Sequence, residues 1–404
     1  MKRTIFYALI ASLSLCLFAC SNTDEPMTTQ STSDGSDKIV YDDSKAIADL
    51  MTSIPLTEEI VNEVFSAVTN GIENGIEESY YFADVLSESA KSATRSTNSE
   101  SKLGAEIRRI LNTTRSNSNI DNDILEFGDY QIYWPYSEDW DGKTKPVITF
   151  VPEDNSQLWN YGFRQTENGI ETIIVDEEYM EHNPVWIINK ADIPYEELPN
   201  FNNNEFSKGG IYYCPEKALP SAQNTTGGNE TRAAGTPVYT VYLGKFMSEK
   251  NYDSVWNGGS EFAIQMGAIE NMVITSQEQL KSTNPSVTYI RITRSRKDIK
   301  KKRWKESNSV LSSDWHQNEN NAGFCIYEED QGGTKYWEMS LSTKIKGIDI
   351  PFTLKMPYGS GDDLIYKVVY SRNFMFSTNN SEGTIHSAGG VYWTMPYKVG
   401  YTEL

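Results

Sequence analysis

Acidic side chains are the groups in this sequence best suited to bind a metal ion. They form short groups at expected loops and strand ends, and the candidate ligands are Asp139, Asp141, Glu329, Asp330, Asp362 and Asp363. Clustered carboxylate oxygens on loops are what Ca²⁺ requires, so Ca²⁺ is the candidate cofactor. None of the groups is a complete EF-hand loop, and a calcium site needs two of the C-terminal loops to meet in space. The alternative is that these residues form solvated acidic turns.

A second candidate site is the basic stretch, residues 291–305, in a chain whose net charge is −20. Its candidate residues for an anionic ligand are Arg291, Arg294, Arg296, Lys297, Lys300, Lys301, Lys302, Arg303, Trp304 and Lys305. They suit an anionic glycan, lipopolysaccharide or membrane headgroups, with Trp304 stacking on a sugar or lying in the membrane interface. The alternative is an exposed hairpin tip whose charges are solvated or pair with acidic loops of the same chain. The overall negative charge argues against nucleic acid as a partner, because it repels phosphate.

Catalytic signatures are missing from the sequence. The three histidines, His182, His316 and His386, lie in no HExxH motif, and there is no GxSxG elbow, P-loop or GxGxxG motif. Glycoside hydrolysis needs two carboxylates about 5–10 Å apart across a cleft. Glu261 and Glu328 lie at or near expected strands, where such residues could sit. The sequence therefore favours a non-enzymatic protein and leaves a glycan-acting hydrolase as the alternative.

Aromatic residues are abundant, with nine tryptophans and 24 tyrosines. Flat rings can stack on sugar faces, although most rings at strand positions belong to the core. Trp140, Trp256 and Trp304 lie near expected loops and are the candidates for sugar contacts.

The N-terminus is typical of an export signal. Lys2 and Arg3 precede the apolar run 5–18, which is too short to span a bilayer as a helix. Ala19-Cys20 after this run resembles the lipobox of bacterial lipoproteins, which implies cleavage before Cys20 and lipid attachment to its thiol. The acidic residues that follow resemble surface-export signals, so we expect an outer-membrane lipoprotein that faces outward rather than toward the periplasm.

The rest of the chain divides by composition and periodicity. The expected segments are a signal peptide (1–19), a flexible tether (20–41), a helical segment (42–124), a small sheet unit (125–217), a linker (218–235) and a β-sandwich domain (236–404). In the helical segment, Ile60, Val64 and Val68 recur at helical spacing, and Thr57 is the expected N-cap.

Short strand-length runs then take over from the helical pattern. The apolar runs 132–136, 146–152 and 184–189 predict a small antiparallel sheet on which the helices pack. From residue 236 onward, short strands alternate with turns, which is typical of a β-sandwich. The expected fold class is therefore mainly β with an α-helical N-terminal portion. Cys214 and Cys325 are expected to be buried free cysteines, with one disulfide between them as the alternative.

This layout resembles uncharacterised cell-envelope lipoproteins of Bacteroides-type bacteria. The resemblance is carried by Trp140-Asp141, by the strands at 146–152 and 184–189, and by the pattern at 252–262 that opens the C-terminal region. It implies an architecture with a helical N-terminal portion and a C-terminal β-sandwich, and it implies a location. It assigns no activity and no functional residue.

The sequence thus predicts a lipid-anchored envelope protein whose C-terminal domain is a non-enzymatic binding or interaction module. Its expected partners are the membrane, through the lipid on Cys20, and a glycan, an envelope protein or an ion. A glycan-acting hydrolase and a structural, pilus-like envelope subunit are the alternatives.

Overall fold

The computed structural model describes residues 44–87, 101–114, 127–154, 156–217, 237–268, 276–282, 285–315, 319–330, 332–378 and 383–401. The expected signal peptide, Cys20, the tether and the linker at 218–235 lie outside the described residues, as does His316. All of the described residues belong to one unit of mutual contacts, Ile39–Leu404.

Helices occupy the first part of the described chain. They are α1 (Ser44–Thr52), α2 (Glu58–Asn74), α3 (Phe82–Val85) and α4 (Lys102–Thr114). The Thr57 side chain accepts a hydrogen bond from the Ile60 amide at the start of α2, and Gly75 ends this helix in the left-handed conformation, with φ 86°. Ile60, Val64 and Val68 are all buried, which confirms the predicted apolar face.

Sheet A follows the helices and includes one strand that precedes α3. Its order is β1-β2-β6-β3-β4-β5, with β1 (Ser79–Tyr81), β2 (Tyr130–Tyr133), β3 (Val147–Phe150), β4 (Trp159–Thr166), β5 (Gly169–Asp176) and β6 (Val185–Lys190). The prediction of an antiparallel sheet is confirmed for the pairings β1–β2, β2–β6, β3–β4 and β4–β5, but it is wrong for β3 and β6, which pair in parallel. The hairpin β4–β5 and helix α6 (Glu177–His182) lie between these two strands in the chain and return it in the same direction.

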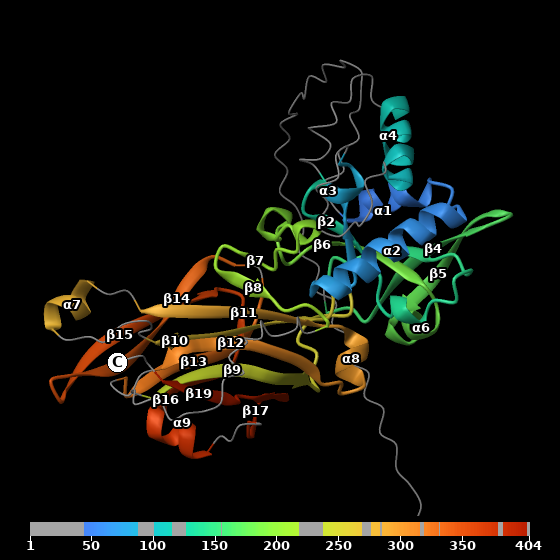
Figure 1. Cartoon of the computed structure of the whole chain (residues 1–404). Helices are drawn as coiled ribbons and strands as arrows, with labels where there is room; N and C mark the ends of the chain where they lie inside the picture. The colour runs from blue at the N-terminus through green and yellow to red at the C-terminus, as the bar shows by residue number, and fades with distance from the viewer. Residues whose placement is uncertain are drawn as a thin grey trace, which may run out of the picture. The chain divides into compact units, whose positions relative to one another are not determined.

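Both faces of sheet A are covered. On one face, Ile132, Trp134 and Ile188 share a core with side chains of α1 and α2 (Figure 1). On the other face, Val147, Val185 and Ile187 pack against Val255 and Trp256, which belong to the loop between β9 and β10. This loop therefore links sheet A to the strands of the C-terminal region.

Sheet B provides the frame of the candidate site. Its order is β16-β13-β10-β11-β8-β7, with β7 (Ser207–Lys208), β8 (Ile211–Tyr213), β10 (Ser260–Ala268), β11 (Ser286–Arg294), β13 (Asn321–Glu328) and β16 (Asp363–Ser371). Strand β8 lies in the segment expected to form the small sheet unit, but it pairs in parallel with β11 of sheet B. The predicted domain boundaries stay predictions.

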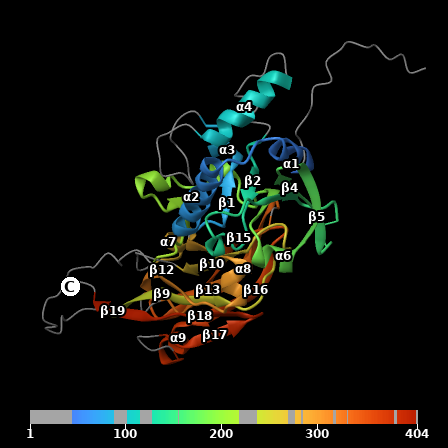
Figure 2. The same cartoon turned by 90° about the vertical axis from the view of Figure 1, so that its right-hand side faces the viewer.

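Sheet C and a long hairpin complete the strands. Sheet C contains β9 (Pro237–Ser248), β12 (Lys305–Trp315), β17 (Ile385–Ala388), β18 (Val391–Thr394) and β19 (Tyr397–Tyr401), with β9 between β12 and β18 and also paired with β19 (Figure 2). The hairpin consists of β14 (Thr334–Ile345) and β15 (Ile348–Gly359). The remaining elements are η1 (Ser137–Asp139), η2 (Tyr195–Glu197), η3 (Phe201–Asn203), α7 (Gln277–Ser282), α8 (Arg296–Lys300) and α9 (Arg372–Thr378).

One apolar cluster contains side chains from sheets B and C. Leu243 and Phe246 of β9 lie in it together with Phe262 and Ile264 of β10 and Trp393 of β18. The described chain is thus a mixed structure in which strands predominate, with helices near its N-terminal end and several sheets, as the sequence predicted.

Two further observations concern the helices and the cysteines. Among the helices that the structure describes, none combines the length and the apolar character needed to cross a bilayer. Cys214 and Cys325 are both buried and free, so the expectation of two buried free cysteines is confirmed.

Candidate functional site

A pocket of about 410 Å³ lies beside one end of sheet B, and we call it the tyrosine pocket. The segment that follows β6 forms one side of it, and the ends of β10, β11, β13 and β15 form the rest. Its aromatic lining is Tyr289, Tyr327 and Tyr358, and its acidic lining includes Asp192, Glu261, Glu329, Asp330 and Asp362. Aromatic rings and carboxyl groups thus line one concave surface.

The alternation of side chains along the strands explains why these residues meet. Ala263 lies opposite Arg291 on β11 and opposite Tyr327 on β13. Residues in register project to the same face of a sheet, and every second residue of a strand does so too. Tyr289 and Glu261 therefore join this row on the pocket face, while the neighbouring Phe262, Ile264, Ile290 and Ile292 enter the core shared by sheets B and C.

An ion pair forms the charged wall of the tyrosine pocket. The guanidinium of Arg291, a side chain only 5 % exposed, donates to both oxygens of Glu329, with Nε–Oε2 at 2.6 Å and Nη2–Oε1 at 2.8 Å. Its Nη1 donates to the Tyr213 hydroxyl at 2.6 Å, and the Tyr289 hydroxyl donates to Glu329. Because bidentate pairs of this kind satisfy donors and acceptors together, Arg291 and Glu329 compensate each other.

Glu261 shows the opposite situation in the same pocket. It is 2 % exposed, and its Oε1 has no hydrogen-bond partner. Burial and the nearby carboxyls of Glu77, Asp253 and Asp192 raise the pKa of Glu261 well above its ordinary value. Burial, with Asp253 and Asp330 close by, raises the pKa of Asp192 to about 8. This side of the pocket therefore collects acidic groups, and neither Glu261 nor Asp192 forms an ion pair within the part of the chain that the structure describes.

The structure separates most of the predicted metal ligands. Asp139 forms an ion pair with Lys297, with Oδ1–Nζ at 2.8 Å. Asp141 caps its own turn by accepting from the amides of Lys143 and Thr144, and these hydrogen bonds lower its pKa. Neither residue belongs to the group of carboxylates that could hold a metal ion among the described residues.

The C-terminal candidates lie close together but differ in their contacts. Glu329 is engaged by Arg291. Asp362 accepts hydrogen bonds from the amides of Gly359 and Asp330, at 2.6 and 3.0 Å, and so holds two loops together. Asp363 begins β16 and is exposed. Asp330 alone belongs to a group of carboxylates that could hold an ion, together with Asp253 and Glu328.

The basic stretch is largely paired within the chain. Most of its cations form ion pairs, which are Arg291–Glu329, Arg294–Asp298, Arg296–Glu177, Lys297–Glu138, Lys300–Glu181, Lys302–Glu249, Arg303–Asp298 and Lys305–Glu216. Arg294, Lys297 and Lys305 are buried. This geometry matches the alternative in which the charges pair with acidic residues of the same chain, and it leaves few of them for an anionic ligand.

The three candidate tryptophans have different surroundings. Trp256 is fully buried and donates from Nε1 to the Gln157 carbonyl at 2.6 Å, so it belongs to the core. Trp140 packs against Phe65 and Trp134, with ring centroids 5.0 and 5.3 Å away. Trp304 is 41 % exposed and is the one candidate that presents a ring to solvent.

The sequence analysis did not identify Asp253 or Asp192 as site residues, nor the tyrosines of the pocket. Asp253 lies in a polar loop rich in glycine before β10, and Asp192 follows β6, so neither carries a motif. One sequence feature could have pointed to this site. An acidic residue lies at or near the end of an apolar strand pattern in two places, at Glu261 and at Glu328. A carboxylate in a fully buried strand needs a partner, and this makes such positions worth testing.

A scan against protein-family models found no match, and no curated protein or solved structure matched the chain. The function is therefore argued from the geometry of the site.

Proposed function

We propose that the protein is a lipid-anchored, surface-exposed envelope protein whose C-terminal β-sandwich binds a neutral glycan in the tyrosine pocket. The lipid anchor rests on the lipobox-like sequence at Cys20. The sandwich rests on the apolar cluster common to sheets B and C. The observation that carries the glycan is the pairing of tyrosine rings with carboxylates in one pocket.

Sugar chemistry suits this pocket. The apolar C–H face of a sugar ring packs on an aromatic ring, while its hydroxyls donate to carboxylates. One face of the Tyr358 ring is stacked on Trp337, with centroids 4.1 Å apart and planes 14° from parallel. A supported ring of this kind is a preorganised stacking surface, and preorganisation reduces the entropic cost of binding.

The charge of the pocket selects among glycans. Its lining contains several carboxylates, while Arg291 is already engaged by Glu329. A uronic acid or a sulfated sugar would meet like charge, whereas a neutral sugar would offer hydroxyl donors. The proposal therefore replaces the anionic glycan expected from the basic stretch with a neutral one.

A thermal-shift screen of the full-length protein in mild detergent tests this proposal. A neutral polysaccharide that binds only the native state raises the melting midpoint. We expect the shift to disappear in Tyr358→Ala and to persist in Tyr336→Ala, a matched control on the same hairpin that is 58 % exposed and outside the pocket lining. Equal shifts in both variants, or a response to anionic polysaccharides alone, would contradict the proposal.

A glycan-acting hydrolase is the second candidate, and Glu261 is the observation that favours it. Its pKa is raised well above the ordinary value, which favours the protonated form that a general acid requires, and Glu329 lies in the same pocket. Incubation of the bound polysaccharide with the protein, followed by measurement of new reducing ends, decides between binding and hydrolysis. Release of sugar by the wild type but not by Glu261→Gln would favour the hydrolase.

A further inference from the structure

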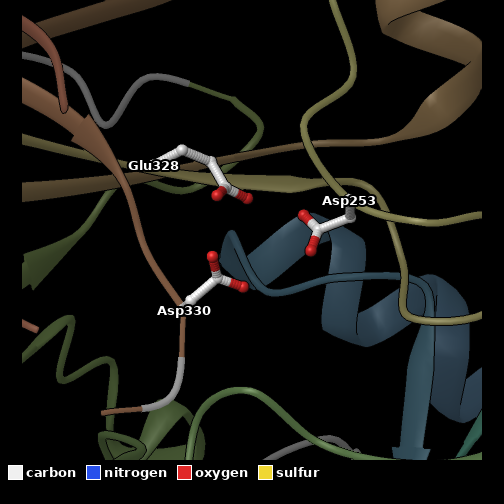
Figure 3. Close-up of side chains that lie close together, drawn as sticks. All are labelled: Asp253, Glu328 and Asp330. Atoms are coloured by element: carbon white, nitrogen blue, oxygen red, sulfur yellow. The ribbon is translucent and has the colours of Figure 1, made fainter. Parts of the chain in front are cut away.

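Three carboxylates from separate parts of the C-terminal region converge next to the tyrosine pocket, and we call them the acidic cluster. Asp253 comes from the loop between β9 and β10, Glu328 is the last residue of β13, and Asp330 lies in the loop that follows it. Each offers one oxygen, and these oxygens all lie within 4.8 Å of one another. Figure 3 shows the three side chains directed toward a common point.

The chain provides no cation for this cluster among its described residues. None of the three carboxylates takes part in an ion pair within those residues. Arg296 acts on Asp253 electrostatically, but its guanidinium pairs with Glu177, and Arg291 pairs with Glu329. Arg296 reaches the backbone carbonyl of Asp253 at 3.4 Å, not its carboxylate. The carboxyl groups of Asp192, Glu261 and Glu77 also lie near Asp253 and add further acidic groups around the cluster.

A second observation is independent of this proximity. Glu328 is 1 % exposed, and its Oε1 has no hydrogen-bond partner. Its carboxyl group is directed toward those of Asp253 and Asp330 (Figure 3). The Oδ2 atom of Asp253 is also buried without a partner. Buried carboxylate oxygens without donors are costly, and native proteins satisfy them with a hydrogen bond or a metal ion.

We propose that Asp253, Glu328 and Asp330 bind a divalent cation, and that this cation is Ca²⁺. Oxygen-only ligands select a hard cation, and Ca²⁺ tolerates the irregular geometry that ligands from two separate segments provide. Oxygens around one Ca²⁺ at about 2.4 Å can be up to about 4.8 Å apart, which agrees with the spacing of the cluster.

The site is buried on one side and open on the other. Glu328 closes it from the strand, while Asp330 is exposed and lines both the tyrosine pocket and an adjoining pocket with Asp192 and Asn257. Ca²⁺ takes about six to eight oxygen ligands, so the three carboxylates leave positions for water on the open side. This inference does not depend on the glycan, because the ion needs only the three carboxylates.

The cation would also have a mechanical effect. The loop that carries Asp253 packs on sheet A through Val255 and Trp256. Asn189 of β6 donates to the carbonyls of Trp256 and Asn257, at 3.2 and 3.0 Å. An ion that joins this loop to the end of β13 therefore ties sheet A to sheet B.

Calcium titration of the EDTA-treated, full-length protein tests the site. We expect isothermal titration calorimetry to give one Ca²⁺ per chain, and a raised melting midpoint that EDTA reverses. Asp330→Asn should weaken binding by about tenfold or more, because affinity follows the number of charged ligands. Asp330 is exposed, so this variant keeps the fold even where Glu328→Gln does not.

The same calcium titration includes a control variant and can give results that overturn the proposal. Glu338→Gln removes an exposed carboxylate that pairs with Lys355 on the hairpin, and it should bind Ca²⁺ like the wild type. The proposal is overturned by a wild-type protein that shows neither heat nor a shift with Ca²⁺, which would mean that protons alone neutralise the cluster. It is also overturned by an Asp330→Asn variant with wild-type affinity. Loss of glycan binding with retained Ca²⁺ binding would refute only the proposed function.

Discussion

The basic stretch and the acidic cluster differ in how the fold compensates their charges. The basic stretch is the densest run of charge in the sequence, yet its cations pair with glutamates and aspartates from distant segments, such as Glu177, Glu138 and Glu249. The acidic cluster joins Asp253 to the distant pair Glu328 and Asp330, and none of these carboxylates forms an ion pair within the described residues. A site is therefore marked by charge that the fold leaves unpaired and not by charge density along the chain.

Breaking the best-compensated pair should have the largest effect on stability. Arg291→Met leaves the carboxylate of Glu329, whose side chain is 14 % exposed, without its cation. Loss of one partner of a buried pair costs about 3–5 kcal/mol. We expect urea unfolding to show this loss, and the double variant Arg291→Met/Glu329→Gln to recover most of it. Single and double variants of equal stability would show that the pair is not a unit.

The pKa of Glu78 reports how far the cations of the basic stretch offset the burial of this carboxyl and the acidic residues near it. Burial raises the pKa of Glu78 to about 8, with contributions from Glu138 and Asp298, although Lys297 and Arg296 oppose the shift. When the pKa of an acid is higher in the folded state, its contribution to the free energy of unfolding is fully present below its ordinary pKa. That contribution is lost as the pH rises through the folded-state pKa. The loss should therefore run from about pH 4.5 to about pH 8.

The variant Glu78→Gln isolates this effect. Urea unfolding of the wild type and the variant across this pH range should give a difference that grows in favour of Gln, on the order of 3 kcal/mol at the alkaline end. A constant difference between the two proteins would mean that the neighbouring cations keep Glu78 charged at neutral pH.

The exposed end of the basic stretch should show the smallest effect. Lys302 pairs with Glu249 at 2.7 Å, but both side chains lie at the surface, where water and salt screen the attraction. Lys302→Ala should unfold at the wild-type urea concentration, within the error of the measurement. A clear shift for this variant would show that compensation at the surface matters as much as compensation in the interior.

Local patterns were sufficient to predict the helices. The apolar spacing of Ile60, Val64 and Val68 and the cap at Thr57 act within a few residues of the chain, and the structure has helix α2 there. Which strands pair with one another was harder to predict from the sequence. The parallel pairing of β3 with β6 depends on contacts between residues about 40 positions apart, for which the sequence carries no local signal.

The candidate site was predictable only in fragments. Asp330 was identified as a candidate ligand because acidic loop residues suit Ca²⁺, and Glu328 was identified as a carboxylate at the end of a strand. Asp253 was not identified, because its position beside Glu328 depends on how its loop packs against sheet A through Val255 and Trp256. The pairing of Lys297 with Glu138 likewise joins distant segments and could not be derived from either one alone.

The sequence by itself determined the periodicity of the helices and strands and the alternation that places Tyr289 and Arg291 on one face of β11. These properties follow from backbone geometry, which acts between neighbours in the chain. Only the tertiary structure decided which charges meet. Electrostatic compensation depends on distance in space and on burial, and both are set by the packing of segments that the chain order keeps apart.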